Sequence, residues 1–151
     1  MVEQQEDQVN WLNRLIEICR DGNTGYKTAA SKIENDELKT ILYRLSQQRA
    51  LFEAELQNEV RGLGGKEEHS GTSAGTLHRA WMNVKEAFSS DDTESLLEEC
   101  KRGDKAAVEV YEKALKADLP AFLKEKVQEQ FNLIKGAITQ LNEFERSEEN
   151  D

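Results

Sequence analysis

Hydrophobic positions along this chain recur at alternating steps of three and four residues over four long stretches. The first of these seams runs from Val9 to Ile33 and passes through Gly22 and Gly25 without losing its register. Such spacing places apolar side chains on one face of an α-helix. We therefore expect one helix to continue through the glycines, where the missing side chains would permit the close approach of a neighbour.

The other seams predict three more long helices and a short one within a single domain that covers residues 1–151. The expected helices span about residues 5–33, 36–63, 76–88, 93–117 and 120–145. Pro120 suits the first turn of the last helix, and residues 147–151 are expected to form a frayed tail. Short turns join the long helices in pairs, and a long Gly-rich connection joins the pairs. This order predicts an all-α, up-down four-helix bundle with one long crossover that carries the extra short helix.

An internal repeat relates the two helix pairs. Glu17-x-Cys19-x-x-Gly22-Asn23 reappears 81 residues later as Glu98-x-Cys100-x-x-Gly103-Asp104. At the same offset Leu38, Leu42 and Gln47 recur as Leu119, Leu123 and Gln128. The repeat predicts two equivalent hairpins related by a pseudo-two-fold axis.

One polar residue lies in the middle of each long seam. These four residues are Asn23, Arg49, Asp104 and Gln130. A buried polar group without a partner costs roughly 1–3 kcal/mol. We expect Arg49 to pair with Asp104, and Asn23 and Gln130 to complete a hydrogen-bonded central polar layer. The alternative is a loose layer in which Arg49 extends its guanidinium to the edge of the bundle.

The two cysteines are also seam residues. Cys19 and Cys100 each lie one turn before the central polar residue of their helix. In antiparallel helices the thiols would fall on opposite sides of the polar layer, roughly 12 Å apart along the axis. This separation is too large for a disulfide, so we expect two buried, unreactive thiols.

Composition narrows the possible partners and the compartment. The net charge is −10, and no run of Lys or Arg offers a surface for nucleic acid or an anionic membrane. No apolar run approaches the ~20 residues of a membrane span. Residues 1–10 lack the apolar region of a signal peptide, and two cysteines without a secretion signal favour the reducing cytoplasm.

The double hairpin with its long crossover resembles the ferritin-like superfamily. The runs 13–22, 45–49, 77–81 and 96–104 are similar to a bacterial family of ferritin-like four-helix bundles that is classed as a domain of unknown function. The resemblance covers nearly the whole chain, from about Val9 to Glu145. It implies a fold and a bacterial protein, but no reaction.

The metal ligands of the superfamily do not carry over to this chain. Its di-iron proteins place a Glu on the first helix of each hairpin and Glu-x-x-His on the second. Here the second helices contain no histidine, and their central seam positions hold Arg49 and Gln130. On the first helices these positions hold Asn23 and Asp104. We therefore expect no di-iron site and no cofactor.

Two classes of function remain. The leading hypothesis is a non-catalytic structural or interaction protein, with a role in stress by analogy with its superfamily. The alternative is a metal-binding or oxidative protein with unconventional carboxylate ligands, drawn from Asp21, Glu99, Asp104 and Glu129. A third, weaker hypothesis is a carrier of a small ligand.

The two histidines, His69 and His78, have no neighbours at ligand spacing. The crossover helix, with Trp81 and Phe88, packs either on its own bundle or on a second subunit. A homodimer therefore stays open, and the sequence identifies no other protein partner.

Overall fold

The computed structural model describes residues 2–67, 81 and 93–149, with side chains from residue 5 onward. It contains the helices α1 (Val2–Ser31), α2 (Asp36–Gly62), α4 (Thr93–Lys116) and α5 (Ala121–Glu149). The described part of the chain has no strand, so the all-α fold class is confirmed. Helix α1 runs unbroken through Gly22 and Gly25, as the register of its seam predicted. The expected helix 76–88 lies outside the described residues except for Trp81.

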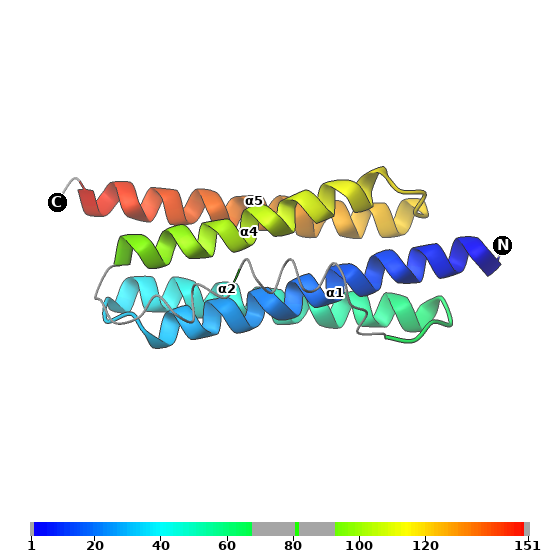
Figure 1. Ribbon diagram of the computed structural model, residues 1–151, viewed down its shortest axis with the longest axis horizontal. Coiled ribbons are helices and arrows are strands. Elements are labelled where there is room, and N and C mark those ends of the chain that lie inside the picture. The colour runs from blue at the N-terminus through cyan, green and yellow to red at the C-terminus, as the bar shows by residue number, and fades with distance from the viewer. Residues whose placement is uncertain (1, 68–80, 82–92, 150–151) are drawn as a thin grey trace.

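The four helices form two hairpins that lie side by side along their length. In Figure 1, α4 runs along α1 in the opposite direction, and α5 runs along α2 in the opposite direction. Helices α2 and α4 therefore begin at the same end of the bundle. The connection between them has to return along the whole bundle, which is the up-down arrangement with one long crossover. No helix among the described residues has the length and apolarity that a membrane span requires.

The helix boundaries follow from local signals. The Asn35 side chain caps α2 by accepting a 2.9 Å hydrogen bond from the backbone N–H of Leu38. Helix α5 begins directly after Pro120, whose carbonyl accepts hydrogen bonds from the backbone N–H groups of Leu123 and Lys124. The helix ends at Glu149, so the prediction of a frayed tail is wrong for residues 147–149. No glycine or proline interrupts this segment, and the helix extends through it.

The core consists of two clusters of buried apolar side chains, one in each half of the bundle. The first surrounds Leu15, Phe52 and Tyr111, and the second surrounds Tyr26 and Leu42. The clusters meet at mid-bundle, where the sequence places its polar residues. The fold thus buries a set of polar side chains in the part of the bundle that is least accessible to solvent.

Candidate functional site

A buried ion pair lies at the centre of the bundle. Arg49 of α2 and Asp104 of α4 are 1% and 0% exposed. Arg49 Nη1 lies 2.5 Å from Asp104 Oδ1, and Nη2 lies 3.1 Å from Oδ2. This two-bond geometry is the strongest way for a guanidinium to bind a carboxylate. The pair joins the two hairpins, and the guanidinium stays inside the bundle instead of reaching its edge.

Tyr26 completes the surroundings of the ion pair. Its hydroxyl donates a hydrogen bond to Asp104 Oδ2, and the Arg49 guanidinium lies 5.3 Å from the centre of its ring. Arg49 Nε donates to Gln48 Oε1 at 3.1 Å. Burial lowers the pKa of Arg49, but the adjacent Asp104 more than offsets this effect and the pKa ends above its usual value. The guanidinium therefore remains charged.

Asn23 and Gln130 bond to other partners than the ion pair. Asn23 Oδ1 accepts a 2.6 Å hydrogen bond from Ser46 Oγ of α2. Gln130 Oε1 accepts a 2.8 Å hydrogen bond from the Tyr111 hydroxyl, and its Nε2 donates to Glu55 Oε1 at 3.3 Å. This differs from the single network that the sequence suggested. The reason is that Gln130 lies next to the first apolar cluster, further along the bundle axis than the ion pair. Asn23 forms its hydrogen bond with Ser46 of the neighbouring helix α2.

The two thiols occupy different clusters. Cys19 lies in the first cluster with Sγ 3.2 Å from the Tyr111 hydroxyl, and Cys100 lies in the second. Both are free and buried. Burial raises the pKa of Cys19 to about 12 and raises that of Cys100 further above its usual value. Burial likewise raises the pKa of Tyr26 and Tyr111 well above 10. Ionisation of these groups is thus strongly disfavoured inside the fold.

The raised pKa values predict a loss of stability in alkali. Below pH 9 the four groups are protonated in both states, so their contribution to stability is fully present. Above pH 9 the thiols ionise in the unfolded chain but not in the folded one, and above pH 10 the tyrosines follow. The free energy of unfolding, measured with urea from pH 7 to pH 11, should fall by up to about 1.4 kcal/mol per pH unit for each titrating group. A Cys19→Ala variant should lose less stability over this range, and a flat profile for the wild type would contradict the buried thiols.

Trp81 fills a slot between the two hairpins. It is 6% exposed, and its ring packs edge-on against Tyr26 with the ring centres 5.1 Å apart. Gly25 of α1 and Gly103 of α4 line the slot, and a β-carbon at either position would lie 2.6 Å from Cδ2 of the indole. The close approach that these glycines permit is therefore that of a crossover side chain. Trp81 packs on its own bundle, one of the two arrangements left open by the sequence.

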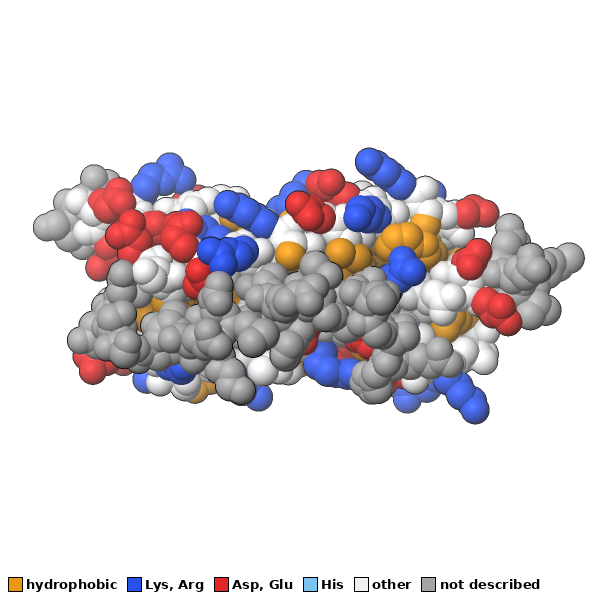
Figure 2. Space-filling model, in the orientation of Figure 1, with side chains coloured by type: hydrophobic (Ala, Val, Ile, Leu, Met, Phe, Trp, Pro, Cys, Tyr) orange, Lys and Arg blue, Asp and Glu red, His pale blue; other side chains and the backbone are white. Residues whose placement is uncertain are grey.

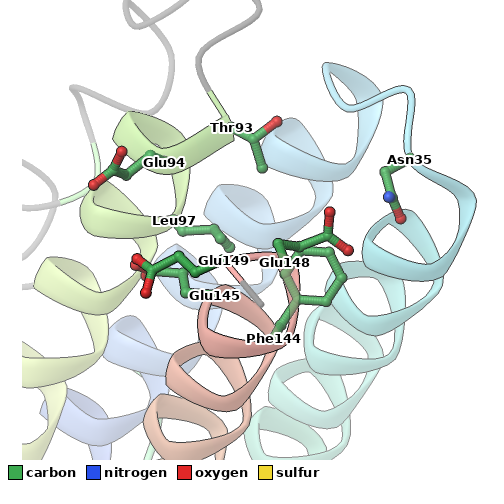
Figure 3. A pocket seen from close by; sticks show the side chains of 8 residues that line it. All are labelled: Asn35, Thr93, Glu94, Leu97, Phe144, Glu145, Glu148 and Glu149. Atoms are coloured by element: carbon green, nitrogen blue, oxygen red, sulfur yellow. The ribbon is translucent and has the colours of Figure 1, made fainter. Parts of the chain in front are cut away.

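A pocket of about 250 Å³ lies where α4 begins and α5 ends (Figure 3). Four glutamates line it, together with the apolar side chains of Leu97 and Phe144. Glu145 Oε1 lies 2.5 Å from Nζ of Lys101, a second buried cation, which also pairs with Glu98. One of the four lining carboxylates, Glu145, is thus paired with a cation, and neither Arg49 nor Asp104 lines the pocket.

The four carboxylates that the sequence offered as unconventional metal ligands do not form a common site. Asp104 is fully engaged by Arg49 and Tyr26, and Glu99 Oε2 lies 3.0 Å from Arg102 Nη1. Glu129 is exposed on α5, and Asp21 is half-buried on α1. Within residues 2–67, 81 and 93–149, no group of three or more His, Cys, Asp or Glu side chains could hold a metal ion.

The sequence matches a known protein family. Residues 7–117 match the family described as "Domain of unknown function (DUF2383)". The chain belongs to this family. The match covers α1, α2, the crossover and α4, and so includes the ion pair and both cysteines of this DUF2383 protein. No curated protein matches the sequence.

A solved structure shares the fold of this DUF2383 chain. It is the bacterioferritin-related protein from Bacteroides fragilis, described as a dodecameric thioferritin, which superposes with a TM-score of 0.74 at 10% sequence identity. The superposition covers 97% of this chain and 88% of that one. The four-helix bundle is therefore ferritin-like.

The centre of this bundle does not fit the di-iron group of ferritin-like proteins. A guanidinium occupies the position between the hairpins, and it binds both oxygens of the central carboxylate. A positive charge at this position repels a divalent cation, and Asp104 has no oxygen free to coordinate one. The residues present build an ion pair in place of a metal site.

Sequence reasoning missed several residues that complete the buried polar groups. Tyr26 and Tyr111 lie at seam positions, where the pattern predicts burial but does not identify the partners that their buried hydroxyls require. Ser46 and Lys101 lay outside the seams and carried no signal at all. Trp81 was recognised as apolar, but its slot depends on two glycines from different hairpins.

Proposed function

We propose that this protein is a non-catalytic structural or interaction protein that uses a ferritin-like scaffold without the di-iron ligand set. The observation that carries this proposal is the Arg49–Asp104 ion pair at the centre of the bundle. The pair links α2 to α4 and so fixes the register of the two hairpins. A buried ion pair of this kind contributes more to a unique arrangement than to stability.

We further propose that the protein acts in the cytoplasm and that its partner is another protein chain. The net charge of −10 disfavours nucleic acid and anionic membranes as partners. The structural neighbour from Bacteroides fragilis is a dodecamer. By analogy, we propose that this chain also associates with itself, as a homodimer, and that its role lies in the response to stress, as for other ferritin-like proteins.

Iron loading tests the absence of a di-iron site. The protein is incubated anaerobically with Fe(II), desalted and subjected to elemental analysis, in parallel with a di-iron ferritin-like protein as a positive control. We expect well below one iron per chain, because the guanidinium repels the cation. About two irons per chain, the content of a di-iron site, would overturn the proposal. Loss of that iron in an Asp104→Asn variant would then assign it to the central layer and support the carboxylate-ligand alternative.

A further inference from the structure

The exposed residues in the middle of α2 carry much less charge than the exposed residues of α4. On α4, the exposed positions are charged at every place except Ser95: Glu94, Glu98, Arg102, Lys105, Glu109, Glu112, Lys113 and Lys116. On α2, the exposed positions between residues 40 and 58 are Thr40, Tyr43, Arg44, Gln47, Ala50, Leu51, Ala54 and Asn58. Only one of these is charged, in a chain in which 33% of residues are charged. The middle of α2 is thus a largely uncharged surface on a strongly charged protein.

These uncharged positions form one stripe along the helix. Thr40, Tyr43, Gln47, Leu51, Ala54 and Asn58 follow steps of three and four residues, and they lie opposite the buried seam of α2. We call them the outer stripe of α2. Tyr43 is 42% exposed and Leu51 is 60% exposed. Leu51 is thus one of the most exposed large apolar side chains of the described residues. The helix therefore has a second face with the spacing of a helix–helix contact.

We propose that the outer stripe of α2 is the surface through which two copies of this protein form an antiparallel, two-fold dimer. This inference rests on the interaction role proposed above and names its surface. Two copies that each carry a charge of −10 repel one another, so they can approach only where charge is absent or complementary. The outer stripe meets this condition, and a two-fold contact uses the same patch on both copies.

The stripe is complementary to itself in the antiparallel direction. Pairing about a centre near residues 48 and 49 sets Tyr43 opposite Ala54 of the second copy, so that a large side chain meets a small one. The same pairing sets Thr40 opposite Asn58 and Gln47 opposite Leu51. In a parallel pairing Tyr43 would meet Tyr43, and the fit of large to small side chains would be lost.

The charges that flank the stripe favour the same pairing. Asp36 and Arg61, at the two ends of α2, lie on one side of the stripe, and both are exposed. They are about 37 Å apart within one helix at ~1.5 Å per residue, so they cannot pair in a single chain. In the antiparallel dimer Asp36 of one copy meets Arg61 of the other. On the opposite side Arg44 meets Glu55, which also pairs with Lys126 of its own chain.

On the α1–α4 side, the exposed side chains of α4 are mostly charged. Figure 2 shows this side, where Lys and Arg side chains alternate with Asp and Glu side chains over α4. Trp81, the described residue of the crossover, is buried against its own α1 and α4. We place the dimer contact on α2 because the antiparallel pairing there removes few charges from water and brings Asp36 of one copy to Arg61 of the other.

Molar mass in solution tests the surface. Light scattering after size exclusion, with the full chain from about 1 to about 100 μM, should give twice the 17.2 kDa mass of the chain at the upper end. Leu51→Glu should raise the dimer Kd at least tenfold or abolish the dimer, since it places two like charges near the axis. Phe122→Glu is the matched control, because Phe122 is 59% exposed but belongs to α5 and not to the outer stripe, and it lies near the end of α2, far along the helix from residues 48 and 49. It should leave Kd unchanged, and circular dichroism should show both variants folded.

A charge swap tests the direction of pairing. Asp36→Arg should raise Kd about threefold to tenfold, the range of exposed ion pairs that are lost and replaced by repulsion. The double variant Asp36→Arg with Arg61→Asp should restore the wild-type Kd. A monomeric wild type at the highest concentration, an equal effect of Leu51→Glu and Phe122→Glu, or failure of the double swap would each overturn this surface. None of these results bears on iron binding, which decides the scaffold proposal separately.

Discussion

Asp104→Ala should lower the free energy of unfolding by about 3–5 kcal/mol, because it leaves the Arg49 guanidinium buried without a carboxylate. Arg49 is 1% exposed, and both of its Nη atoms bind Asp104. Because the guanidinium is buried, solvent cannot easily replace the lost carboxylate. The Tyr26 hydroxyl loses its acceptor in the same variant. Urea denaturation at pH 7, followed by circular dichroism, measures the loss.

Two further variants separate the buried pair from charge in general. Replacing the ion pair and its tyrosine together, as Arg49→Met, Asp104→Leu and Tyr26→Phe, should recover most of the lost stability, because apolar residues of similar volume often match a buried ion pair. Lys126→Ala removes the partner of Glu55 in a pair that is about one-third exposed, leaves the Gln130–Glu55 hydrogen bond in place, and should cost at most about 1 kcal/mol. If Asp104→Ala cost no more than Lys126→Ala, the central pair would have to be hydrated.

Trp81→Ala should destabilise the bundle by a similar amount, about 3–5 kcal/mol, the range for an aromatic side chain removed from a core. The indole fills the slot between Gly25 and Gly103 and packs on Tyr26, and glycines cannot close the space that it leaves. The same urea titration measures the effect.

A double-variant cycle with Gly103 distinguishes the Trp81 slot from a general packing defect, because the effect of Gly103→Ala on stability should change sign when Trp81 is removed. Gly103→Ala alone should destabilise by about 1–3 kcal/mol, because its β-carbon would lie too close to the indole. In the Trp81→Ala background the same change should stabilise, since the obstacle is gone and Ala is about 1 kcal/mol better than Gly in a helix. Gly136→Ala, with nothing within 4 Å of the new β-carbon, should stabilise in both backgrounds. A Gly103→Ala effect of the same sign in both backgrounds would contradict the slot.

The helices could be predicted from the sequence because their information is local. The unbroken register from Val9 to Ile33 outweighed the turn-like Gly22 and Gly25, and α1 is indeed continuous. The apolar face of each helix can be identified from apolar residues three and four positions apart in that helix alone. The C-terminal end was the exception: charge and position suggested a frayed tail, but nothing in residues 147–149 stops a helix.

The candidate site was less predictable because it depends on contacts between hairpins. Seam position identified Arg49 and Asp104 as central, but it could not show that Gln130 faces Tyr111 or that Asn23 faces Ser46. Those partners depend on the rotation of each helix about its axis, which a repeating pattern defines only to within a residue. The Trp81 slot was hidden for the same reason, since its two walls lie 78 residues apart in sequence, at Gly25 and Gly103.

The polar layer also determines where the folded protein can open most easily. Contacts between the two hairpins are sparser than those within each hairpin, and the ion pair crosses this weaker boundary. When the hairpins separate there, water rehydrates Arg49 and Asp104, which returns part of the energy that opening costs. An apolar layer would gain nothing from such exposure. Hydrogen exchange of the backbone amides should therefore reveal two cooperative units, one for each hairpin. The hairpins should separate from one another at a lower free energy than either hairpin unfolds.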